Sequence, residues 1–323
     1  MADEDVLDPL DGLIASALQL NGRAAWRDIA SAVDSTETTV ARRAQRLIDA
    51  GTVRVTVSRT PACSGLSQVA TVYIRCAPGR PREVAATIAE RPEVWSTGVY
   101  AGDFDVICQV TVPSGAALVD ILLGELQGIP GVVSSVAELM TRTFKVSYAW
   151  ARHLLGDRAA ALDVLPVAHQ NDGHVLSEFD AAVLEVLRPN ARLSFASVAN
   201  QLGTNESTVR RRFEALRRQG CVNVATFVPP AVMGFQPPML MKLTLAPGQL
   251  EPAAAALTGY AGVRYMAASL GRLGLLLEVN LATPSDVYDF TTRVLGEIGG
   301  ITEVHIWTEL IALKRAYIRL DQP

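Results

Sequence analysis

The stretch 36–51 reads TETTVARRAQRLIDAG and predicts a helix with two unlike faces. Its apolar residues recur at spacings of three and four, the period of a single stripe that faces a core: Val40, Ala44, Leu47 and Ile48. Gly51 follows the last of them and is typical of a helix C-terminus. Threonine and arginine occupy the opposite face, so this helix is expected to present a basic polar surface.

Two shorter helical patterns come before it. Asp8-Pro9 suits an N-cap followed by proline at the first helical position, and the apolar spacing from Leu10 to Leu18 predicts a helix that runs to about Leu20. A similar pattern covers Trp26 to Val33. Three short helices with a tight turn before the third predict a helix-turn-helix.

The same pattern returns later in the chain. Residues 205–220 read NESTVRRRFEALRRQG, and Asp11 and Asp180 mark the common offset of 169 residues. At that offset Arg23 matches Arg192 and Lys145 matches Lys314, with no net gap between them. This period is far above the 20–50 residues of solenoid repeats, so a whole multi-domain unit is duplicated.

A second domain follows each helix-turn-helix. In the first copy the patterns predict strands and helices in the order βαββαβ, the ferredoxin-like arrangement. The expected ranges are Val69–Cys76, Pro81–Glu90, Val94–Ala101, Phe104–Thr111, Gly115–Leu126 and Val132–Lys145.

The fold class is therefore α+β, with two tandem units that each join a winged helix-turn-helix head to a βαββαβ sensor domain. We expect head 1 at residues 1–58, sensor 1 at 59–153, a linker at 154–175, head 2 at 176–227 and sensor 2 at 228–323. Gly156, Pro166 and Asn171-Asp172-Gly173 support the linker.

The polar faces of the third helices predict contact with double-stranded DNA. Arginine can pair with guanine or phosphate, and Ser or Thr near a helix N-terminus reaches phosphate or base edges in the major groove. The candidate residues are Thr38, Thr39, Arg42, Arg43 and Arg46 in head 1, and Ser207, Thr208, Arg210, Arg211 and Arg212 in head 2. A solvated basic face is the alternative, and its occurrence in both copies favours DNA.

The combined pattern resembles the Lrp/AsnC (leucine-responsive/asparagine, or feast/famine) regulators. In head 1 the resemblance rests on Leu10-Asp11 and on residues 35–43 and 47–51. In sensor 1 it rests on Arg91-Pro92-Glu93-Val94, Gly102-Asp103-Phe104-Asp105, Ile129-Pro130-Gly131-Val132 and Lys145. It implies a sensor that dimerises through its sheet and binds an amino acid or related small metabolite near Gly102, Asp103, Phe104 and Asp105. Sensor 2 has Gly271-Arg272-Leu273-Gly274 there, so an ammonium group could not pair with carboxylates in the same way. Ordinary turn chemistry is the alternative for Asp103 and Asp105.

Composition excludes several other classes. The chain has 49% hydrophobic residues and a net charge of −4, so it is expected to be globular, with any DNA binding confined to local basic surfaces. An acidic start and apolar runs too short to cross a bilayer predict a cytoplasmic protein without membrane contact. The four cysteines are far apart and are expected to be buried free thiols rather than metal ligands. We expect no cofactor, no metal and no catalytic residue, because none of the four histidines has a recognisable partner.

Three functions remain open at this point. The favoured one is a sequence-specific transcription regulator. An architectural protein that coats DNA with little sequence preference would share the same heads, and a metabolite-binding protein whose heads no longer bind DNA is disfavoured by the two arginine clusters.

The duplication also makes two predictions about assembly. The two sensors of one chain should pair face to face as an intramolecular pseudo-dimer, because they are tethered copies of a dimerising unit, and chains are expected to assemble further. The heads should read different half-sites, since Ala41 matches Arg210, Gln45 matches Glu214 and Arg46 matches Ala215.

Overall fold

The computed structural model describes residues 6–60, 68–147, 150–162 and 176–320. The chain divides into two compact units that alternate along the sequence. One unit holds both heads together with residues 150–162, and the other holds both sensors. The predicted α+β class with a duplicated head and sensor is confirmed.

Head 1 contains the three predicted helices, α1 (Pro9–Leu20), α2 (Trp26–Ala32) and α3 (Glu37–Asp49). Asp8 caps α1 by accepting a hydrogen bond from the Asp11 N–H at 3.0 Å. Thr36 does the same for Thr39 at the start of α3, and Gly51 closes that helix in the left-handed region at φ +73°. Ile14, Leu18, Ile29, Val40 and Ala44 are fully buried and form the core.

Head 2 repeats this arrangement with α7 (Glu178–Leu187), α8 (Phe195–Leu202) and α9 (Glu206–Arg218). Ser177 and Asp180 form a reciprocal capping box at the start of α7. Phe213 and Leu216 of α9 are buried against the other two helices.

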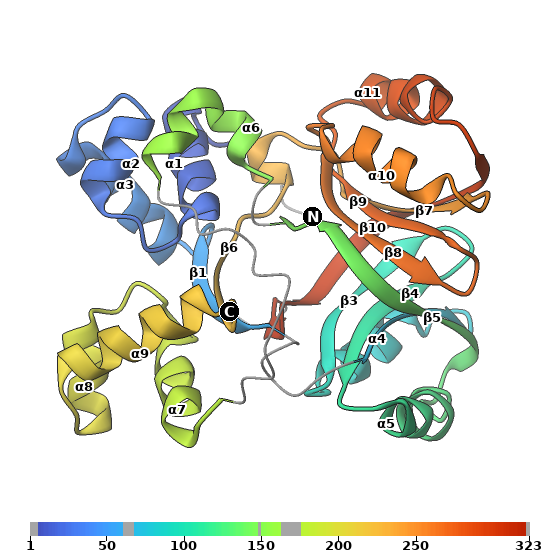
Figure 1. Ribbon diagram of the computed structural model, residues 1–323, viewed down its shortest axis with the longest axis horizontal. Coiled ribbons are helices and arrows are strands. Elements are labelled where there is room, and N and C mark those ends of the chain that lie inside the picture. The colour runs from blue at the N-terminus through green and yellow to red at the C-terminus, as the bar shows by residue number, and fades with distance from the viewer. Residues whose placement is uncertain (1–5, 61–67, 148–149, 163–175, 321–323) are drawn as a thin grey trace. The chain divides into compact units, whose positions relative to one another are not determined.

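A two-stranded antiparallel ribbon joins the heads, made of β1 (Arg54–Arg59) and β6 (Val222–Phe227) (Figure 1). Thr56 pairs with Ala225, its own equivalent at the offset of 169 residues. A pseudo-two-fold axis therefore passes between these two residues. β1 packs against α7 of head 2 and β6 against α1 of head 1, so each strand is buried on the other copy's helix.

Sensor 1 comprises β2 (Gln68–Cys76), α4 (Pro81–Ala89), β3 (Val94–Ala101), β4 (Val106–Val112), α5 (Gly115–Val119) and β5 (Val132–Lys145), in the predicted order. The strands lie in the order β3-β4-β2-β5. Two boundaries differ from the prediction by more than one residue. β4 begins at Val106 because Phe104 and Asp105 belong to the preceding turn, and the helix predicted to reach Leu126 becomes a π-helical segment over Asp120–Leu126.

Sensor 2 comprises β7 (Met239–Leu245), α10 (Leu250–Thr258), β8 (Val263–Leu270), β9 (Gly274–Val279), α11 (Pro284–Asp289) and β10 (Ile301–Arg315), followed by the short β11 (Ile318–Arg319). A π-helical segment again follows its second helix, at Phe290–Val294. Each sensor has its own core between helices and sheet.

The two sensors pair within the chain as predicted, but they do so by strand pairing at both edges of their sheets as well as through the facing side chains of Tyr73 and Trp307. β5 pairs with β8 and β10 pairs with β3, both antiparallel. Leu139 faces Leu270, and the equivalent pair Thr308 and Ala101 repeats that register at the offset of 169 residues. The bulges in the two seams fall at equivalent positions as well, so the backbone of the joined sheets has pseudo-two-fold symmetry.

The start of the predicted linker is helical. α6 (Arg152–Leu155) and a 3₁₀ turn over Gly156–Ala161 pack on α1 and α2, with Trp150, Leu155 and Leu162 buried. Residues 163–175, the rest of that segment, lie outside the described residues. Within the described ranges no helix is long and apolar enough to cross a membrane.

One expectation for the cysteines is wrong. Cys76 and Cys108 are free thiols, but Cys221 is half of a disulfide. Wide sequence spacing therefore did not exclude a bond, because cysteines distant in sequence can be brought together by the fold.

Candidate nucleic-acid interface and ligand site

The recognition helices α3 and α9 present their polar residues to different degrees. Thr38, Arg42 and Arg46 of α3 are exposed, as are Ser207, Arg210 and Arg211 of α9. The other four candidates are half-buried: Thr39, Arg43, Thr208 and Arg212. The ten predicted residues thus form an outer set, which is exposed, and an inner set, which is half-buried.

The inner arginines are held within their own heads. Arg43 donates to Asp8 at 2.5 Å and to Asp11 at 3.0 Å, and Arg212 donates to Asp180 at 2.9 Å. The hydrogen bonds to these aspartates raise the pKa of both guanidinium groups. Arg43 and Arg212 therefore fasten the first helix of each head to the recognition helix, and orient the helix for its outer residues.

The outer pair, Arg42 and its equivalent Arg211, is the most available to a ligand. Both lie at the sixth position of their helix, and the described part of the chain contains no hydrogen-bond or ion-pair partner for either side chain. Arg46 lies one turn further along α3 and pairs with Asp11, although its side chain is 58% exposed. An arginine free at this place can donate to phosphate or to guanine.

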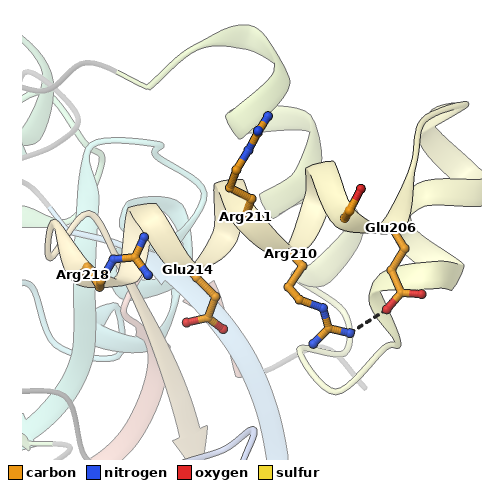
Figure 2. A pocket seen from close by; sticks show the side chains of 6 residues that line it. Glu206, Arg210, Arg211, Glu214 and Arg218 are labelled. Carbon is orange, nitrogen blue, oxygen red and sulfur yellow. Dashed lines mark hydrogen bonds and ion pairs between the residues drawn. The ribbon is translucent and has the colours of Figure 1, made fainter.

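The outer face of α9 is slightly hollowed. Glu206, Ser207, Arg210, Arg211, Glu214 and Arg218 line this shallow groove. Arg210 donates to Glu206 at 2.6 Å, and Figure 2 shows Arg211 projecting away from Arg210 and Glu214. The groove carries both cationic and anionic groups, so it suits base edges that offer acceptors as well as donors.

A reciprocal exchange of arginines fixes the two heads together. Arg23 donates to the Ala191 and Leu193 carbonyls of head 2 and lies 4.2 Å from the ring of Phe195. Its equivalent Arg192 donates to the Gly22 and Ala24 carbonyls of head 1 at 2.6 and 3.0 Å. Burial lowers the pKa of both to about 10, so both remain cations at neutral pH.

The predicted ligand turn of sensor 1 divides into structural and available groups. The Asp105 carboxylate accepts from the Cys76 N–H at 2.7 Å, and Phe104 packs on Tyr73 and Trp307. Gly102 has φ +150° and lies so close to Trp307 that a Cβ atom would clash with its ring. Asp103 accepts from Trp307 Nε1 at 2.5 Å and lies 3.7 Å from His305, but its side chain stays 44% exposed. Of the two carboxylates, Asp103 is the one a ligand can reach.

Sequence comparison places both kinds of domain in one family. The model of the AsnC-type helix-turn-helix domain matches residues 7–48 and 176–217, and that of the Lrp/AsnC ligand binding domain matches residues 69–150. An uncharacterized HTH-type transcriptional regulator of Pyrococcus furiosus is 34% identical over 145 residues, which are 45% of this chain and 98% of that protein. The chain belongs to the Lrp/AsnC family.

Two further comparisons agree with a doubled Lrp/AsnC unit. The HTH-type transcriptional regulator LrpA of Pyrococcus horikoshii is 28% identical over 131 residues, 40% of this chain and 93% of its own length. The crystal structure of the siroheme decarboxylase NirDL aligns with 98% of this chain and 95% of its own, with a TM-score of 0.63. Identity to NirDL is 13%, so that likeness shows the fold alone.

Lysines at the ends of the long strands connect the two Lrp/AsnC sensors. Lys145 donates to the Thr258 and Tyr260 carbonyls at the C-terminus of α10, at 2.9 and 3.0 Å. Lys314 donates to the Arg91 carbonyl just after α4, at 2.6 Å. A cation is favourable at a helix C-terminus, so each sensor caps a helix of the other.

The centre of the sensor pair is asymmetric despite this symmetric frame. On one side Tyr73 packs against Trp307, with ring centroids 5.1 Å apart. On the equivalent side Lys242 and Glu138 form a buried ion pair, and Lys242 also donates to Ser269. None of these four residues was predicted from the sequence, because the repeat shows which positions are equivalent but not which ones are in contact.

Proposed function

We propose that this Lrp/AsnC chain is a sequence-specific DNA-binding transcription regulator whose activity is modulated by an amino acid or a related small metabolite. The observation that carries the DNA part is the pair of exposed arginines, Arg42 and Arg211, at equivalent places on two recognition helices. The Arg23 and Arg192 exchange holds those helices in one unit. The relatives named above are transcriptional regulators, and we propose no catalytic role for this chain.

Binding at fixed salt tests the proposal. Affinity for an operator selected from random DNA is compared with affinity for an unrelated duplex, and a ratio of at least about 10³ is expected for a regulator. A ratio near one would favour an architectural protein that coats DNA. No binding to either duplex would contradict a DNA partner altogether.

Variants identify the binding face. Arg42→Ala and Arg211→Ala should each weaken operator binding by about 1–3 kcal/mol if the contact is to a base. A phosphate contact should instead lower the salt dependence of binding. Arg82→Ala, an exposed arginine on α4 of sensor 1, is the matched control and should leave binding unchanged.

For the effector, we propose one site per chain at the Gly102–Asp105 turn of sensor 1, with Asp103 pairing the ammonium group. Asp103 already contacts the indole N–H of Trp307, so an effector that binds the carboxylate should change tryptophan fluorescence. Titration with a panel of amino acids is the test. Asp103→Asn should abolish the response and the exposed Asp120→Asn should preserve it; a response retained in Asp103→Asn would place the site elsewhere.

We also propose that whole chains assemble further into homo-oligomers. The intramolecular pairing uses both sheet seams, while Val304, Ile306 and Leu310 of β10 remain 37–56% exposed. An apolar strip of this kind suits contact between copies. Light scattering after size-exclusion chromatography measures the chain number directly, and a single-chain mass across the concentration range would contradict the assembly.

A further inference from the structure

The two recognition helices differ in chemistry at matching positions that are exposed or half-buried. Ala41 of α3 corresponds to Arg210 of α9, and Gln45 corresponds to Glu214. One turn further on, Arg46 corresponds to Ala215. These three differences lie beside the shared Arg42 and Arg211, on the face that the proposed function directs to DNA.

The frame that carries these helices is symmetric and is built from one chain. β1 and β6 pair about Thr56 and Ala225, and Arg23 and Arg192 exchange contacts between the heads. A DNA duplex that binds this unit therefore meets one α3 and one α9. In a homodimer the two recognition helices would be identical, and the operator would mirror that identity.

We infer that the chain reads a non-palindromic operator in one fixed orientation, with unlike half-sites under α3 and α9. This inference rests on the proposed function. On α3, Gln45 has the amide geometry that pairs with adenine, Ala41 offers a methyl contact to thymine, and Arg46 can pair with guanine or phosphate. Arg210 can pair with guanine, and Glu214 can accept from the cytosine amino group.

The contacts of these side chains in the free protein do not oppose the readout. Arg210 pairs with Glu206 at 2.6 Å, and Gln45 bonds Asp49 at 2.8 Å. Glu214 lies 3.9 Å from Arg217. All three are short-range contacts along an exposed helix, a class that contributes little and is readily exchanged for DNA contacts.

The shared arginines show which half belongs to which helix. Arg42→Ala should relax base preference in the α3 half only, and Arg211→Ala in the α9 half only. Each loss should be about 5- to 150-fold for the preferred base over its competitors. Relaxation of both halves by either variant would contradict a fixed orientation.

The decisive experiment selects binding sites from random duplexes with the full-length chain and with a helix-converted variant. Arg210→Ala, Glu214→Gln and Ala215→Arg together give α9 the α3 residues at these three positions. The wild-type chain should select unlike halves, and the converted variant should select two like halves of the α3 type. Arg82→Ala serves as the control and should select the wild-type site.

The outcomes separate this inference from the proposed function. A symmetric consensus for the wild-type chain would overturn the inference and leave a sequence-specific regulator. Failure of the wild-type chain to enrich any sequence would overturn the proposed function. A converted variant that still selects the wild-type site would overturn the inference, because it would show that positions 210, 214 and 215 do not read bases. Far-ultraviolet circular dichroism and retained binding to unrelated DNA at low salt verify that this variant is folded.

Discussion

Replacing Lys242 with Met should destabilise the sensor pair strongly, because it removes the cation from a buried ion pair. The Lys242 and Glu138 side chains are 4% and 9% exposed. Methionine fills a similar volume without charge, and it leaves the Glu138 carboxylate buried beside Tyr73. Breaking a buried pair in this way costs about 3–5 kcal/mol. The Ser269 hydroxyl also loses its donor, which adds about 1 kcal/mol.

The double variant Lys242→Met with Glu138→Leu should recover most of that loss. Both charges are then absent, so neither has to be desolvated, and replacing a buried pair with apolar residues of similar volume is often neutral. We expect a stability within about 1 kcal/mol of the wild-type chain. The coupling free energy from the double-mutant cycle should accordingly be at least about 2 kcal/mol.

Urea unfolding of the full-length chain measures these differences. Trp307 lies in the same inner cluster as Tyr73 and reports on the sensor pair, while circular dichroism reports on the whole chain. Coincident transitions are required before the midpoints are converted to free energies. If Lys242→Met cost less than about 1 kcal/mol, or if the double variant were as unstable as the single one, the buried-pair argument would be refuted.

Two other perturbations follow from the charge networks. Burial opposes the charge on Glu278, but Arg264 and Arg315 hold the pKa of this carboxyl below its usual value. The carboxylate therefore stabilises the fold at pH values above the unfolded pKa of about 4.5. It loses that contribution as the pH falls through the lowered pKa of the folded state. Glu278→Gln should therefore lower the melting temperature at pH 7, by the equivalent of about 3 kcal/mol. It should also reduce the loss of stability that thermal melts show below pH 4.5. An unchanged loss of stability below pH 4.5 would contradict this. Arg43→Ala should lower the melting temperature and weaken binding to every DNA sequence by the same factor, since the side chain holds α1 to α3. A changed base preference would instead show that Arg43 reads DNA directly.

Local patterns in the sequence predicted the elements well, and for an identifiable reason. Spacings of three and four, proline at the start of α1 and glycine after α3 are signals within one helix, so they placed α1 and α3 correctly. The strand Val94–Ala101 was predicted at its observed limits, because alternation and the following Gly102 are equally local. The π-helical segments carry no comparable local signal.

Contacts between the copies were not predictable in this way. Arg23 and Arg192 match at the offset of 169 residues, but a match does not show that each side chain crosses to the other head. The inner arginines illustrate the same limit. Arg43 and Arg42 look alike in sequence, and only the positions of Asp8 and Asp11 in the fold show that Arg43 is held within its head.

The side chains at the sensor interface decide which copies pair, although the backbone would permit any combination. Pairing sensor 1 with another sensor 1 would place Glu138 near Tyr73 on both sides, with no lysine to neutralise it. Pairing sensor 2 with another sensor 2 would bury Lys242 beside Trp307 on both sides, with no carboxylate. An unpaired buried charge costs several kcal/mol, so only the unlike pair satisfies both sides. A duplicated chain can hold such differences, because each copy mutates alone, whereas a homodimer repeats every substitution twice. The divergence of α3 from α9 has the same origin, and the β1–β6 ribbon with the exchange of Arg23 and Arg192 holds the two unlike heads in one unit.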